Sequence, residues 1–219
     1  MRPSQTLSSR RAVIVPADGV TLRGDLVVPE RAIGIVLFAH GSGSGRFSPR
    51  NRFVASVLQA TGCATLLFDL LTDAEAADRV LVFDIGLLAT RLRQATRWLE
   101  TDEELAGLPV AYFGASTGAA AALVAAAESP AMIRAVVSRG GRPDLAGDYL
   151  PAVEAPTLFI VGGADTGVVE LNEGALKRLR CTKKLEIVPG ATHLFEEPGA
   201  LEEVSRLAAD WFALHLASR

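Results

Sequence analysis

Short apolar runs recur along the chain, and each has the length of a strand. They are four to six residues long, rich in Val, Ile, Leu and Phe, and lie at 33–38, 64–68, 110–113, 133–137, 157–161 and 185–188. A continuous apolar run suits a strand that is covered on both faces. The pattern therefore predicts six buried strands.

Segments with apolar residues at helical spacing separate these runs. They lie at 50–62, 83–99, 117–127, 170–179 and 201–216. Strand followed by helix, repeated about five times, predicts a mostly parallel sheet with helices on both faces. Two further apolar segments, 13–15 and 21–28, flank a turn at 17–19 and predict an N-terminal antiparallel hairpin. The expected class is α/β.

The length of the chain favours one domain over 1–219. With 219 residues, 49% of them hydrophobic, it can bury a sizeable core, and neither a linker nor a repeat divides it. The longest candidate for a lid, 70–82, is polar. We therefore expect no lid domain.

Charge and cysteine content exclude several classes of partner. The 22 Lys and Arg residues against 25 Asp and Glu residues give a net charge of −3, which does not favour nucleic acid. The longest run of small apolar residues, 119–127, is too short to span a membrane. Cys63 and Cys181 form neither a disulfide framework nor a zinc pattern, so we expect a cytoplasmic protein without metal or cofactor.

The strongest chemical signal is Gly-Ala-Ser-Thr-Gly at 114–118, between a predicted strand and a predicted helix. Gly-x-Ser-x-Gly in that place is typical of a nucleophile elbow, a tight turn that exposes the serine hydroxyl above the sheet. Ser116 is therefore the candidate nucleophile.

A serine nucleophile needs a base and an acid to orient it. Of three histidines, His193 follows the last predicted strand, where a base is expected, whereas His215 lies in the last helix and His40 precedes a glycine-rich loop. Asp165 follows the 157–161 strand and completes the order Ser, Asp, His. Asp144, which follows the preceding strand, is the rival acid.

A tetrahedral intermediate also needs two backbone donors for its oxyanion. One is expected at the amide of Thr117, directly after the nucleophile. The other is expected in the loop His40-Gly41-Ser42-Gly43-Ser44-Gly45, where the Ser42 amide is the preferred candidate.

With these motifs the chain resembles the α/β-hydrolases over nearly its whole length. Within them it resembles the small dienelactone hydrolase-like branch, on 39–43, 114–116, 162–165 and 193–198. The resemblance implies an α/β-hydrolase fold without a lid domain and hydrolysis of an ester or related acyl compound.

Two features depart from that branch. Its typical members use a cysteine nucleophile, where this chain has Ser116, and they hold a substrate carboxylate with an arginine at the position of Glu197. Arg139 and Arg142, at another strand exit, are possible substrate-binding replacements. Alternatively, they brace Glu196, Glu197 or Asp144, and the acid at 197 favours bracing.

The predicted function is a serine hydrolase that cleaves small carboxylic esters or lactones through an acyl-enzyme. Ser116 attacks, His193 transfers the proton, Asp165 orients the histidine, and the amides of Thr117 and Ser42 bind the oxyanion. Two alternatives stay open, an acyltransferase with the same triad and a non-catalytic binding member of the fold. The sequence does not indicate an oligomeric state.

Overall fold

Eight strands form one sheet in the computed structural model, which describes residues 7–217. The strands are β1 (Leu7–Ala17), β2 (Val20–Pro29), β3 (Gly34–Ala39), β4 (Cys63–Phe68), β5 (Val110–Ala115), β6 (Ile133–Arg139), β7 (Thr157–Gly162) and β8 (Lys183–Val188). Their order across the sheet is β1-β2-β4-β3-β5-β6-β7-β8. β1 and β2 are antiparallel to their neighbours, and β3 to β8 are parallel.

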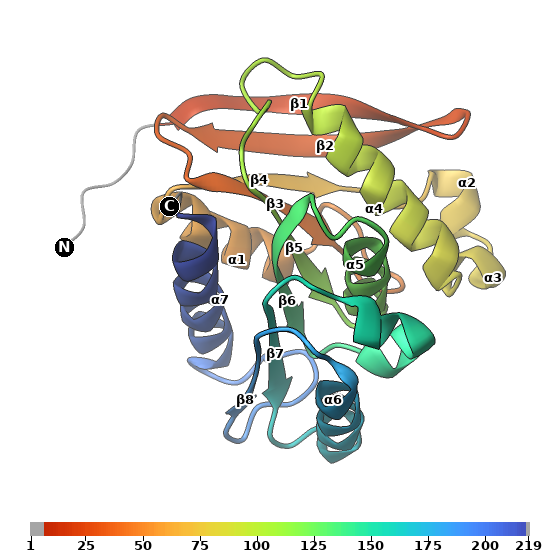
Figure 1. The fold of residues 1–219 in the computed structure, drawn as a ribbon, viewed down its shortest axis with the longest axis vertical. Coiled ribbons are helices and arrows are strands. Elements are labelled where there is room, and N and C mark those ends of the chain that lie inside the picture. Colours follow the sequence, from red (N-terminus) through yellow and green to blue (C-terminus); the bar gives the residue numbers. More distant parts are fainter. Residues whose placement is uncertain (1–6, 218–219) are drawn as a thin grey trace.

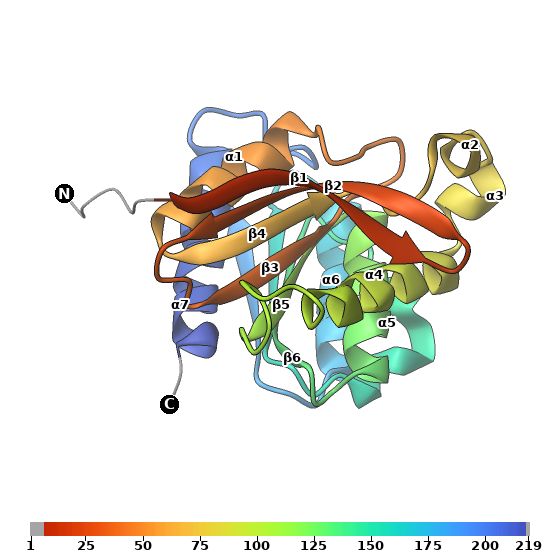
Figure 2. The ribbon, with the colours of Figure 1, turned by 90° about the horizontal axis from the view of Figure 1, so that it is seen from above.

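Helices cover both faces of the sheet, as predicted. They are α1 (Pro49–Ala60), α2 (Asp73–Ala76), α3 (Arg79–Val82), α4 (Ile85–Leu99), α5 (Thr117–Glu128), α6 (Thr166–Arg178), α7 (Ala200–Leu216) and a 3-10 segment, η1 (Pro143–Ala152). α1 and α7 lie on one face and α4, α5 and α6 on the other (Figures 1 and 2). The chain therefore has the α/β-hydrolase type of architecture.

The N-terminal hairpin turns at Asp18 and Gly19, which have positive φ angles of 37° and 78°. Two successive residues in the left-handed region give a turn whose twist matches that of the flanking strands. The predicted antiparallel pair is confirmed and is longer than the apolar pattern indicated.

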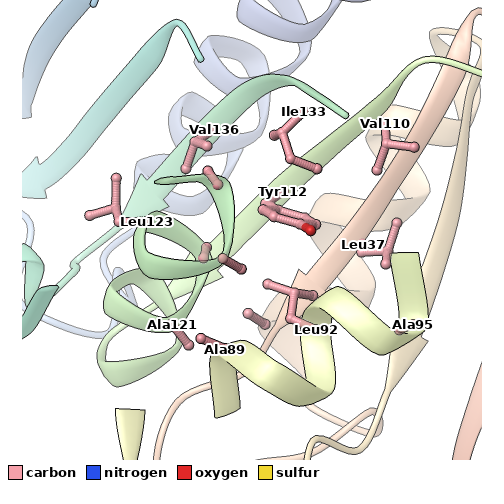
Figure 3. Packing of buried hydrophobic residues seen from close by; sticks show 14 of the residues in the cluster. Leu37, Ala89, Leu92, Ala95, Val110, Tyr112, Ala121, Leu123, Ile133 and Val136 are labelled. Carbon is pink, nitrogen blue, oxygen red and sulfur yellow. The ribbon is translucent and has the colours of Figure 1, made fainter. Parts of the chain in front are cut away.

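Each face of the sheet has its own apolar core. The core under α4 and α5 includes Tyr112, whose ring lies between sheet and helices near Leu92 and Ile133 (Figure 3). The Tyr112 hydroxyl lies 2.6 Å from Thr96 Oγ1, so its polar end has a partner inside the core. The second core lies under α1 and α7 and contains Phe38, Phe113 and Phe212.

The structure corrects three details of the predicted pattern. β8 is mostly exposed, because it is the edge strand and pairs only with β7. α2 and α3 were not predicted, since four-residue helices show no apolar period. η1 was also missed, and it is broken at Gly147, where φ is 50°.

No helix among residues 7–217 is both long enough and apolar enough to cross a membrane.

Candidate active site

Ser116 lies in a strained turn between β5 and α5. Its backbone angles, φ 51° and ψ −121°, fall in a region that L-residues rarely occupy. A Cβ at Gly114 would lie 2.4 Å from Ala119 Cα, and one at Gly118 would lie 2.1 Å from the Ala39 carbonyl oxygen. Both outer positions of the motif must therefore be glycine, which is the geometry of a nucleophile elbow.

Asp165 and His193 come together although 28 residues separate them. Asp165 follows β7 and His193 follows β8, and His193 Nδ1 lies 2.7 Å from Asp165 Oδ2. A carboxylate accepts the Nδ1 proton of a neutral imidazole and leaves Nε2 as the basic nitrogen. The arrangement is suited to general-base chemistry at Nε2.

Asp144, the rival acid, has a different partner. Arg142 donates from Nε to Asp144 Oδ1 at 2.9 Å and from Nη2 to Oδ2 at 2.8 Å. This two-pronged pair occupies both oxygens of the Asp144 carboxylate. The structure thus pairs His193 with Asp165 and not with Asp144.

Ser116 and His193 line one cavity of about 250 Å³ at the carboxyl ends of the strands. The other walls come from the loop after β3, the first turn of α1 and the end of β6, which contributes Arg139. Its lining residues include four serines, two arginines and an asparagine, and no Asp or Glu. The cavity is therefore polar and positively charged.

The predicted oxyanion donors lie side by side, but one is occupied. The Ser42 amide donates to Thr117 Oγ1 at 3.0 Å. A Cβ at Gly41 would lie 3.1 Å from Ser116 Cβ, so this loop lies directly against the candidate nucleophile. An oxyanion could use the Ser42 amide only after displacing the Thr117 hydroxyl, a contact that the sequence did not predict.

Residues at the end of β4 hold this glycine-rich loop in place. Asp69 accepts from the Arg46 amide at 2.8 Å and forms an ion pair with the Arg46 guanidinium. His40 Nδ1 lies 3.1 Å from the Gly41 carbonyl oxygen, and its Nε2 accepts from the Leu70 amide at 3.0 Å. These partners select the neutral Nδ1–H form, and burial lowers the pKa of His40.

Of the three acids that the arginines were expected to brace, the described part of the chain pairs only Asp144 with one of them, Arg142. Arg142 pairs with Asp144, whereas Glu196 lies 3.4 Å from Arg50 and Glu197 accepts from the Thr192 hydroxyl. Bracing of Glu196 or Glu197 by Arg139 or Arg142 is therefore wrong for the described residues. Arg139 instead faces the cavity beside Ser116.

The glycine-rich loop also lines a second cavity, of about 380 Å³. Gly41, Ser42 and Ser44 line both cavities, and Leu71 and Val82 give the second one an apolar wall. Within residues 7–217, no three His, Cys, Asp or Glu side chains cluster in a way that could hold a metal ion.

Similarity to known proteins agrees with this geometry. The family model described as "Dienelactone hydrolase family" matches residues 72–214. The chain belongs to the dienelactone hydrolase family. A dienelactone hydrolase from Anabaena variabilis is 59% identical, with a TM-score of 0.92 over 94% of this chain and 98% of that one.

Two further proteins widen the comparison. Est1E from Butyrivibrio proteoclasticus shares the fold, with a TM-score of 0.80 at 17% identity over 94% of this chain and 99% of that one. A Mycobacterium tuberculosis protein with the provisional name phosphoribosyl transferase is 62% identical over 93% of this chain. The match spans only 46% of the length of that protein.

Proposed function

We propose that this member of the dienelactone hydrolase family is a serine hydrolase of small carboxylic esters or lactones. The observation that carries the proposal is the Asp165–His193 pair, 2.7 Å apart, beside an elbow that holds Ser116 at positive φ. An oriented histidine and a partly exposed serine at one cavity are the parts that acyl transfer requires.

The proposed reaction has two halves. Ser116 Oγ attacks the ester carbonyl carbon while its proton moves to His193 Nε2, and the oxyanion of the tetrahedral intermediate accepts from backbone amides. The carbon–oxygen bond to the leaving alcohol then breaks, and the alcohol takes the proton from His193. Water repeats the sequence on the acyl-enzyme and releases the acid and free Ser116.

Strain at Ser116 fits this role. A residue at φ 51° costs folding free energy of about 1–3 kcal/mol, and such strain persists where function needs it. The glycine-rich loop and the N-terminus of α5 supply the amides, with Thr117 as one donor. The Ser42 amide becomes the second donor once its bond to Thr117 Oγ1 opens.

The transferase name of the mycobacterial relative does not change the proposal for this chain. That name belongs to a protein of which the match spans 46%, and its activity need not reside in the shared part. An acyltransferase would use the same residues and differ only in the acceptor. Product analysis with and without an added alcohol separates acyl transfer from hydrolysis.

Hydrolysis of p-nitrophenyl esters by the purified chain tests the proposal. We expect Ser116→Ala and His193→Ala each to lower kcat by a factor on the order of 10⁴–10⁶, because the two residues act as one unit. Circular dichroism and thermal melts check that both variants are folded. Full activity in a folded Ser116→Ala variant would refute the proposal.

A further inference from the structure

Arg139 is a buried cation that has no acidic partner within residues 7–217. It is the last residue of β6 and is 8% exposed. Its Nε and Nη1 atoms have no hydrogen-bond partner among the described residues. Burial, together with the charge of Arg50, lowers the pKa of Arg139 to about 10. An unpaired buried charge destabilises a fold, so this placement indicates a binding role for Arg139.

Arg139 is close to the candidate nucleophile. The Ser116 amide donates to the Arg139 carbonyl oxygen at 3.3 Å, and both residues line the same cavity. A group held by Arg139 would therefore belong to a molecule that also reaches Ser116.

The first turn of α1 forms another wall of that cavity. Ser48, Arg50 and Asn51 line it, and Ser48 is the N-cap of the twelve-residue helix. The N-terminus of a helix of this length carries a partial positive charge that favours anions. Arg50 Nε is also buried without a partner among the described residues.

The charge of the cavity indicates the charge of the ligand. Two guanidiniums and a helix N-terminus face it, and no acid lines it. Within residues 7–217, the ion-pair partner of Arg50 is Glu196, at 3.4 Å and two-thirds exposed. A carboxylate would bring one negative charge, whereas a phosphate monoester brings about 1.5 to 2 and three acceptor oxygens.

We propose that Arg139, Arg50 and the first turn of α1 form a phosphate subsite, so that the substrate is a small ester carrying a phosphate group. This inference rests on the proposed function for its ester part only. The phosphate contacts involve no atom of Ser116 or His193, and phosphate binding can be measured without catalysis.

The first test is thermal unfolding of the Ser116→Ala variant with increasing inorganic phosphate, against chloride at the same ionic strength. We expect phosphate to raise the Tm by at least about 2 °C and Arg139→Met to abolish the rise. Arg178→Gln, which removes a surface arginine paired with exposed Asp148, is the matched control and should keep the rise. If phosphate does not raise the Tm of the Ser116→Ala variant more than chloride does, the proposed subsite is overturned.

The ligand-free Arg139→Met variant distinguishes a binding role from a structural one. Removal of an unpaired buried charge should leave the Tm in chloride unchanged or raise it. A large fall in Tm would mean that Arg139 also supports the fold, and the phosphate effect in Arg50→Met then decides the binding role. Should that variant not fold, Arg50→Met serves instead, because Arg50 is one-third exposed and its loss should still remove the phosphate effect.

The second test identifies the anion by kinetics on three matched substrates: acetyl glycerol phosphate, acetyl glycerate and acetyl glycerol. We expect kcat/KM to be roughly 10- to 100-fold higher for the phosphate ester than for the neutral one, and Arg139→Met to remove the difference. Preference for the glycerate would overturn the phosphate assignment. If no ester is cleaved while phosphate still stabilises the protein, the proposed function fails and the subsite stands.

Discussion

Asp144 and Asp165 follow neighbouring strands, and their partners give them different roles. Sequence order alone admitted both as the acid of a triad, because the distance along the chain does not reveal which side chain a carboxylate meets. In the structure the Arg142 guanidinium occupies Asp144, and His193 contacts Asp165. The choice between them depends on side-chain contacts that only the folded chain provides.

Exchange of each acid for its amide tests this assignment. Asp165→Asn should lower kcat by a factor on the order of 10⁴, because an amide no longer holds the imidazole in the required tautomer. Asp144→Asn removes only an ion pair near the surface and should change kcat a few-fold at most. Steady-state kinetics on one activated ester compares the two. A damaging Asp144→Asn with a mild Asp165→Asn would reverse the assignment.

The sequence identified some residues of the candidate site and missed others. Ser116 and its two glycines were predictable, since the turn excludes any side chain at Gly114 and Gly118. The contact of the Ser42 amide with Thr117 Oγ1 was not, because it depends on one side-chain rotamer. Arg50 was missed as a cavity residue, although Ser48-Pro49 marked the start of its helix directly after the glycine-rich loop.

At the scale of elements, the segment from β3 to α1 connects the core to the candidate site. His40, at its start, spans two loops, because its ring contacts the Gly41 carbonyl and the Leu70 amide. A protonated ring would turn Nε2 into a donor that faces another donor. The loop that carries the proposed oxyanion amide is therefore held by a neutral histidine.

The pH dependence of stability tests that role of His40. Burial lowers its folded pKa below the usual 6.5, so the unfolded chain binds a proton that the folded chain does not. Stability should therefore fall as pH drops below about 6.5, by up to about 1.4 kcal/mol per pH unit from this group. Urea unfolding at a series of pH values from 7.5 to 5 measures the free energy of unfolding. We expect this free energy to change less with pH in His40→Gln than in the unaltered protein. If the free energy of unfolding depends on pH equally in both proteins, His40 is not the buried neutral group described here.

The predictability of each element follows from its environment. Strands β3 to β7 were predictable because both of their faces are buried at nearly every position, Arg134 in β6 excepted, so that the runs are mostly apolar. β8 lies at the edge of the sheet and is buried only at Val188, yet its apolar residues at 185, 187 and 188 still predicted a strand. α2, α3 and η1 are short or broken, so they lack the period from which a helix is recognised.

At the scale of the whole molecule, the cavity at Ser116 is small and polar. The segment 71–82, which helps to line the neighbouring cavity, forms the two short helices α2 and α3. Neither of these two cavities offers a long apolar channel for an acyl chain. We expect acetyl and butyryl esters to be turned over faster than octanoyl and longer esters, without activation by a lipid interface. A series of p-nitrophenyl esters measures this. Faster cleavage of the long-chain esters would contradict the prediction.

The central claim is that Ser116 is a nucleophile activated by His193 and Asp165. Covalent labelling by a fluorophosphonate tests it directly, because the probe reacts with an activated serine and leaves a stable adduct. The account predicts one adduct per chain, located on Ser116 by peptide mass spectrometry, absent in Ser116→Ala and strongly slowed in His193→Ala. An adduct on another residue, or equal labelling of a folded His193→Ala variant, would contradict it.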